Sequence, residues 1–175
     1  MADAVRFRPT EVLRHLAEHE VEYVLIGGLA ATLHGSPVRT GDADICPAPA
    51  PANLARLAAA LRSMDAGLRV EGEPGRIPFR CDAQFLARME IVNLRTRFGA
   101  LDISKQPAGT DGYADLTEHA VEMQVGDFKV AVASLSDVIR SKEAANRPKD
   151  HETLPTLYAL RDEIAEQERR AGPRR

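Results

Sequence analysis

Two closely spaced aspartates are the first candidates for chemistry in this sequence. Asp42 and Asp44 lie in the stretch Asp42–Cys46, which alternates polar and apolar residues as a half-buried strand does. Side chains two apart on a strand point to the same face, so the two carboxylates would aim at one point. Because like charges this close repel unless a cation neutralises them, the pair predicts an oxygen-preferring divalent ion, Mg²⁺ or Mn²⁺.

A third aspartate lies in a similar context. Leu101 and Ile103 would face a core, which turns Asp102 and Ser104 to the other side of the same strand. If this strand pairs beside the first, Asp102 completes a cluster of three carboxylates. Such a cluster suits two divalent ions about 4 Å apart, one activating an attacking hydroxyl and the other holding a triphosphate.

Phosphate-binding features accompany the acidic residues. The short run 22–26, which is rich in strand-forming residues, ends at Gly27-Gly28, where backbone N–H groups can approach a phosphate with no Cβ in the way. Arg39 just before the acidic pair could offset phosphate charge. Residues 140–175 carry a net charge of +2 against −5 for residues 1–139, and this basic patch could serve as counter-charge for a triphosphate. Its candidate cations are Lys142, Arg147 and Lys149.

Each feature also has a plain structural explanation. An Asp-x-Asp pair is common in solvated loops, Gly-Gly is common in turns, and Asp102 could lie on the exposed face of an edge strand. The basic patch could be a solvated helix surface. Tyr113 could stack on a base or fill the core, and His34 could touch a ligand or pack. The remaining histidines form no cluster and are given no role: His15, His19, His119 and His151.

Composition bounds the class of protein. The chain has 175 residues, 44% of them apolar and 28% charged, which predicts one globular domain. A net charge of −3 argues against a general nucleic-acid or membrane-surface binder. Cys46 and Cys81 predict free thiols rather than a disulfide scaffold. With no signal-peptide pattern and no apolar run of about 20 residues, we expect a soluble cytoplasmic protein with no membrane partner.

Periodicity predicts an α/β (α+β) fold in which helices flank a small mixed sheet. Residues 1–133 would form the core, 134–168 a C-terminal helical element packed on it, and 169–175 a frayed tail. The expected helices are 9–20, 29–34, 53–64, 134–146 and 148–168. The expected strands are 22–26 and 42–46, followed by hairpins of 90–96 with 100–104 and of 121–125 with 128–133, while 66–80 is rich in loops.

Several motifs occur together in an order that resembles a known family. They are Val24–Ala30, His34-Gly35, Arg39-Thr40, Asp42–Ile45, Asp111–Tyr113, Val130–Leu135, Ile139–Lys142 and Arg147–Asp150. Over about residues 20–160 the sequence resembles small bacterial nucleotidyltransferase-fold proteins of the DNA polymerase β-like superfamily. The branch that it resembles most is that of the abortive-infection toxins.

This resemblance implies a role for each matching residue. Asp42 and Asp44 would be the metal pair, and Asp102 the third metal ligand and general base. Gly27 and Gly28 would hold the phosphates of an NTP, and Lys142 would contact the triphosphate. Arg147, Lys149 and Asp150 match an Arg-x-Lys-Asp element of the closing helices. The wider superfamily has Gly-Ser where this chain has Gly27-Gly28, so a seryl phosphate ligand is missing.

The implied function is metal-dependent transfer of a nucleotidyl group from an NTP to an acceptor hydroxyl. The toxin-like branch implies RNA such as tRNA as an acceptor, or alternatively a protein, and an antitoxin partner. A second hypothesis keeps the fold and loses the chemistry, which would make the chain a nucleotide-binding or protein-interaction module.

Overall fold

A mixed β-sheet forms the centre of the computed structural model, which describes residues 6–73 and 75–171. Within these residues the sheet has seven strands in the order β3-β4-β5-β2-β1-β7-β6. The strands are β1 (Tyr23–Ile26), β2 (Asp42–Pro47), β3 (Gly67–Leu68), β4 (Ile91–Thr96), β5 (Gly99–Ser104), β6 (Val121–Val125) and β7 (Phe128–Val132).

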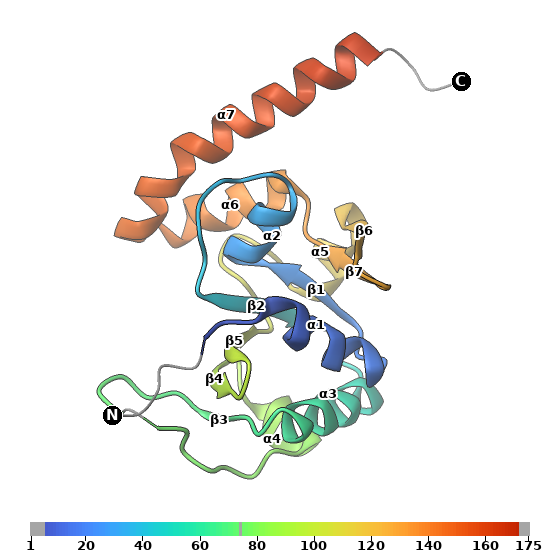
Figure 1. Ribbon diagram of the computed structural model, residues 1–175, viewed down its shortest axis with the longest axis vertical. Helices are drawn as coiled ribbons and strands as arrows, with labels where there is room; N and C mark the ends of the chain where they lie inside the picture. The colour runs from blue at the N-terminus through green and yellow to red at the C-terminus, as the bar shows by residue number, and fades with distance from the viewer. Residues whose placement is uncertain (1–5, 74, 172–175) are drawn as a thin grey trace.

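Helices lie at both ends of this sheet. They are α1 (Pro9–Glu18), α2 (Gly27–Leu33), α3 (Pro51–Ser63), α4 (Ala83–Arg88), α5 (Tyr113–His119), α6 (Leu135–Ala145) and α7 (Pro148–Ala171). Figure 1 shows α2, α6 and α7 at one end of the molecule and α3 and α4 at the other, with the sheet between them. The mixed α/β architecture expected from the periodicity is confirmed.

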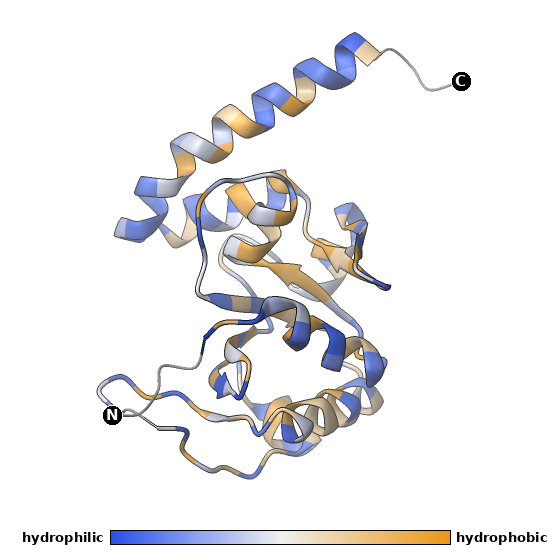
Figure 2. Cartoon of the chain, in the orientation of Figure 1, coloured by the Kyte–Doolittle hydropathy of each residue, from blue (hydrophilic) through white to orange (hydrophobic). Residues whose placement is uncertain are grey.

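Strand pairing fixes the geometry of the centre. β2 runs antiparallel to β1 and parallel to β5, and β4-β5 and β6-β7 are antiparallel hairpins, as the sequence predicts. Ala43, Ile45, Leu101 and Ile103 are buried on the core face, at most 3% exposed. Figure 2 shows β1 as apolar along its length, whereas polar residues alternate along α7. The opposite faces of β2 and β5 are thereby left for polar side chains.

Short elements depart from the sequence expectation. α4 and α5 were not predicted, because helices of six or seven residues are too short to show a helical period. The Asp82 carboxylate starts α4 by accepting a hydrogen bond from the backbone N–H of Phe85 at 2.8 Å. α2 begins at Gly27, two residues earlier than expected. Residues 169–171 belong to α7, and residues 1–5 and 172–175 of the expected core and tail lie outside the described residues.

Two further expectations concern cysteines and membranes. Cys46 and Cys81 are free thiols, the first buried and the second half-buried. None of the described helices is both long enough and apolar enough to cross a membrane.

Candidate active site

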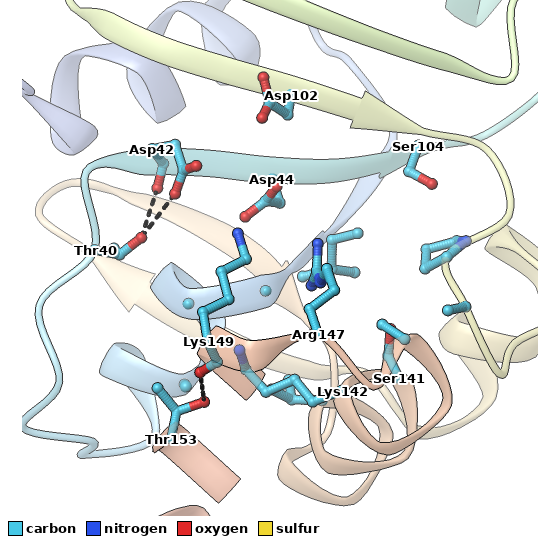
Figure 3. Close-up of a pocket in the computed structure, with 18 of the residues that line it drawn as sticks. Thr40, Asp42, Asp44, Asp102, Ser104, Ser141, Lys142, Arg147, Lys149 and Thr153 are labelled. Atoms are coloured by element: carbon cyan, nitrogen blue, oxygen red, sulfur yellow. Dashed lines mark hydrogen bonds between the residues drawn. The ribbon is translucent and has the colours of Figure 1, made fainter. Parts of the chain in front are cut away.

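Three carboxylates meet on the polar face of β2 and β5. The parallel register sets Asp44 directly opposite Asp102, and Asp42 lies two residues earlier on the same face of β2. One carboxylate oxygen from each of the three lies within 4.8 Å of the others. Figure 3 shows the three side chains on the two neighbouring strands. The structure therefore brings together the three acidic residues singled out in the sequence.

The residue that follows β1, Gly27, lies in close contact with this cluster. Ile26 pairs with Asp44, so the next residue starts α2 directly beside that carboxylate. Gly27 has φ +68°, and a Cβ built on it would lie 2.9 Å from Asp44 Cγ, closer than side chains approach. Only glycine combines this backbone conformation with this close approach.

A hydroxyl group fills the space above the second glycine. A Cβ on Gly28 would lie 2.9 Å from Thr40 Oγ1. The same hydroxyl donates a hydrogen bond of 2.8 Å to Asp42 Oδ1, shown as a dashed line in Figure 3. The absence of a side chain at residue 28 therefore allows Thr40 to hold one member of the acidic pair.

The protonation of the acidic cluster reflects its crowding. Burial, followed by the neighbouring charges of Asp42 and Asp102, raises the pKa of Asp44 to about 7, although Lys149 and Arg147 oppose the rise. Burial also raises the pKa of Asp102, against the hydrogen bond from Arg69 that lowers it. Within the described chain no donor group bonds the Asp44 carboxylate. A cation beside Asp44 would relieve this repulsion.

The raised pKa of Asp44 predicts that the metal-free protein loses stability as the pH rises. The folded state binds the proton more tightly than the unfolded chain, in which the aspartate has its ordinary pKa of 3.8. The stabilisation by this proton is complete below that value and disappears as the pH rises through about 7. We expect the free energy of unfolding in EDTA to fall by about 2–4 kcal/mol between about pH 4 and about pH 8.

Urea denaturation at the two pH values measures this loss, and Asp44→Asn is the matched variant because an amide does not titrate. The variant is expected to remove most of the difference. Equal pH dependence in the two proteins would show that the loss comes from other groups.

Cationic side chains face the acids across a cavity of about 660 Å³. Lys142 comes from α6, Arg147 and Lys149 from the junction of α6 with α7, and Arg39 from the loop before β2. In Figure 3, Lys149 extends from the start of α7 toward Asp44. Gly27 and Gly28 line the same cavity, so the carboxylates, the glycine turn and the cations all border one space.

Asp150 does not line this cavity, although the resemblance had grouped it with the nucleotide-binding residues. Its side chain is fully buried and bonds Lys142 Nζ at 3.2 Å and Arg147 Nε at 2.8 Å. Burial alone would raise the pKa of Asp150, but the hydrogen bonds from Arg147 and Lys142 outweigh burial and lower the pKa to about 2. Asp150 is therefore the buried anion that fixes two of the four cations.

Two of the cations remain free to meet a ligand. Over residues 6–73 and 75–171, neither Arg39 nor Lys149 has a side-chain hydrogen bond or an ion pair. His34, in contrast, bonds within the protein, since its Nε2 lies at the hydrogen-bonding distance of 2.8 Å from the carbonyl oxygen of Ala133. Tyr113 packs against the core.

The acidic cluster fits a divalent metal ion. Its donor set consists of carboxylate oxygens, which Mg²⁺ and Mn²⁺ prefer, and these oxygens are close enough to share an ion. Asp42, Asp44 and Asp102 would be the ligands. The missing side chain of Gly27 leaves room for the Asp44 carboxylate in this position.

Sequence reasoning missed charged residues of the site, among them Arg69 and Glu152, which lines the cavity from α7. Arg69, which follows β3, contacts both carboxylate oxygens of Asp102, at 2.8 and 2.5 Å. It lies in the loop-rich stretch 66–80, where no periodicity indicates the direction of a side chain. Asn93 was also missed, but the hairpin register could have found it, because it pairs with Asp102 on β4.

Known proteins resemble this chain in structure but not in sequence. The sequence matches no family model and no curated protein. The structure is similar to the crystal structure of the lincosamide antibiotic adenylyltransferase LnuA bound to lincomycin, with a TM-score of 0.59 and 17% identity over 89% of this chain and 99% of that one. It is also similar to a protein from Thermotoga maritima classed as a nucleotidyltransferase, with a TM-score of 0.52 and 16% identity over 85% of this chain and 89% of that one.

Both neighbours are covered almost along their full length, so the similarity extends over the whole arrangement of sheet and helices rather than one motif. This chain has the nucleotidyltransferase fold.

Proposed function

We propose that the protein is a metal-dependent nucleotidyltransferase that moves an NMP group from an NTP to an acceptor hydroxyl. The observation that carries the proposal is the meeting of Asp42, Asp44 and Asp102 opposite a wall of cations in one cavity. A metal–triphosphate complex requires negative groups on one side, which bind the metal, and positive groups on the other, which bind the phosphates.

In this proposal Asp42 and Asp44 hold divalent metal, with Asp102 as the third ligand. When bound, the metal supplies Lewis-acid stabilisation of charge on the reacting phosphate and hydroxyl. Asp102 takes the proton of the acceptor hydroxyl while the oxygen of that hydroxyl forms a bond to the α-phosphorus of the NTP. The bond from the α-phosphorus to the bridging oxygen breaks, and pyrophosphate leaves. Burial raises the pKa of Asp102, which favours proton uptake.

The phosphate side of the reaction belongs to the glycine turn and the helices. Backbone N–H groups at Gly27 and Gly28 would bind phosphate oxygens. Lys142 and Arg147 would meet the triphosphate as fixed cations, because Asp150 already orients them. Arg39 and Lys149 would complete the counter-charge as the pyrophosphate leaves.

For the acceptor we propose the hydroxyl of an RNA end such as that of tRNA, in a toxin that an antitoxin partner controls. The support is the ordered set of motifs shared with the toxin-like branch. Since the net charge is −3, RNA would rely on local cations rather than on general attraction. Because such an enzyme would need both NTP and tRNA, we propose that it works in the cytoplasm.

A small-molecule acceptor is the second candidate, and the wall beside Asp102 favours it. Apart from Asp102, the residues of β4, of β5 and of the loop after β5 that line the cavity are uncharged, among them Ile91, Asn93, Ser104 and Gln106. Such a wall suits a neutral molecule better than an RNA backbone. The neighbour LnuA is itself an adenylyltransferase of a lincosamide antibiotic.

Transfer of label from α-³²P-labelled NTPs tests the function. With total tRNA or a panel of hydroxylated small molecules as acceptor, we expect labelled product with Mg²⁺ and at least about 100-fold less in EDTA. Which acceptor pool becomes labelled decides between the two acceptor classes.

Calorimetry with a non-hydrolysable NTP completes the test. Tight NTP binding that does not depend on Mg²⁺, together with no labelled product from any pool, would favour the non-catalytic module over the enzyme.

A further inference from the structure

One of the three carboxylates already forms an ion pair with a positive side chain. Arg69 Nη2 lies 2.8 Å from Asp102 Oδ1 and 2.5 Å from Oδ2, and the two side chains are 33% and 18% exposed. We propose that Arg69 is a resident counter-ion of Asp102, so that without nucleotide the site holds one divalent ion on Asp42 and Asp44 and takes a second only when Arg69 moves away. This inference rests on the proposed function, since it describes the same metal cluster.

The position of Arg69 explains how it reaches the cluster. Its backbone N–H donates to the carbonyl oxygen of Asn93 at 2.9 Å, which holds it beside β4. Asn93 pairs with Asp102 on the next strand. The guanidinium must therefore reach across β4 to contact Asp102 on β5. Arg69 is not among the residues that line the cavity with the cations of α6 and α7.

Among the described residues, Asp102 is the one hydrogen-bond partner of the Arg69 side chain. Its Nε is buried without a hydrogen-bond partner in the described structure, and Asp102 is the partner of its terminal nitrogen. If the guanidinium left, its pair with Asp102 would break, but the buried Nε–H would reach solvent and gain a hydrogen-bond partner. Lys142 and Arg147 differ, because both bond a fully buried carboxylate. Arg69 is thus the exchangeable cation of the site.

Charge explains why Arg69 limits the number of metal ions. At Asp102 the guanidinium already balances the carboxylate, which leaves Asp42 and Asp44 as the two carboxylates for a single divalent ion. A second divalent ion would share Asp102 with the guanidinium, and two cations at one carboxylate repel each other. The negative charge of an incoming triphosphate would compensate for this repulsion, which links the second ion to the nucleotide.

Titration with Mn²⁺ alone, followed by electron paramagnetic resonance of the free ion near neutral pH, tests the inference without any need for transferase activity. Wild type is expected to bind one ion. Arg69→Ala is expected to bind two, with an affinity for the second ion at least about tenfold higher than in wild type. Arg69→Lys keeps the charge and is expected to stay at one ion. Arg88→Ala, which removes an exposed arginine outside the cavity lining, is the matched control.

Three results would overturn the inference. They are two ions on wild type, identical titrations of wild type and Arg69→Ala, and no binding by either protein. No binding would also remove the metal from the proposed function, whereas the other two would leave that function standing. Arg69→Gln, which keeps much of the side-chain length without the charge, is titrated in parallel and decides the result if the alanine variant fails to fold by circular dichroism.

Discussion

Replacement of Asp44 by asparagine is expected to lower nucleotidyl transfer at least about 1,000-fold while the protein stays folded. Asp44 lies at the centre of the cluster, opposite Asp102 and two residues from Asp42. An amide keeps the size of the carboxylate but loses its charge, so the proposed divalent ion would lose one of its three ligands. Asp42→Asn is expected to act in the same direction. The measurement is the initial rate of label transfer at saturating Mg²⁺.

The stability of the same variant provides an internal check. Because the ionised carboxylate is unfavourable in the metal-free protein, Asp44→Asn should not destabilise the fold. Asp162→Asn is a matched control, since Asp162 is an exposed residue of α7 paired with Arg161. If the Asp44 variant kept a rate within about threefold of wild type, the metal role of this residue would be excluded.

Gly27→Ala is expected to lower the transfer rate about 100-fold and the free energy of unfolding by about 2 kcal/mol. The positive φ at this position is unfavourable for alanine, and the new Cβ would push against the Asp44 carboxylate. A displacement of the metal ligand by a fraction of an ångström is enough to affect catalysis. The rate and the urea midpoint are both measured.

Gly41→Ala is the control for this glycine. It lies next to Asp42, but a Cβ built on it meets nothing within 4 Å. It should leave both rate and stability near wild type. Equal effects of the two substitutions would mean that general changes to the glycine-containing loops, rather than contact with Asp44, cause the loss.

The acidic cluster was predictable because strand alternation determines it. The alternation of polar and apolar residues in Asp42–Cys46 and around Asp102 puts the polar side chains of each strand on one face. The pairing of β2 with β5 does not follow from this alternation. The strand-forming run that ends at Gly27-Gly28 likewise indicated a turn at the end of a strand. These features are local, so sequence periodicity reveals them.

Other parts of the site depend on contacts distant in sequence. Arg69 reaches Asp102 from a segment without periodicity, and the two residues are 33 positions apart in the sequence. The burial of Asp150 was equally hidden, because an aspartate in the first turn of a polar helix is normally exposed. Only the packing of α6 against α7 brings Lys142 and Arg147 around it.

The division of charge between the two sides of the cavity links ligand binding to architecture. The strands β2 and β5 carry the three clustered carboxylates. Three of the four cations that line the cavity come from α6, from the junction of α6 with α7 and from the start of α7, where Glu152 adds one acidic side chain. A bound metal–nucleotide complex would therefore link the sheet to the last two helices, with the metal on the carboxylates and the phosphates on the cations. Because the metal and the nucleotide would bind different parts of the chain and also each other, binding of either one would favour binding of the other. Their joint binding would also stabilise the packing of the helices on the sheet.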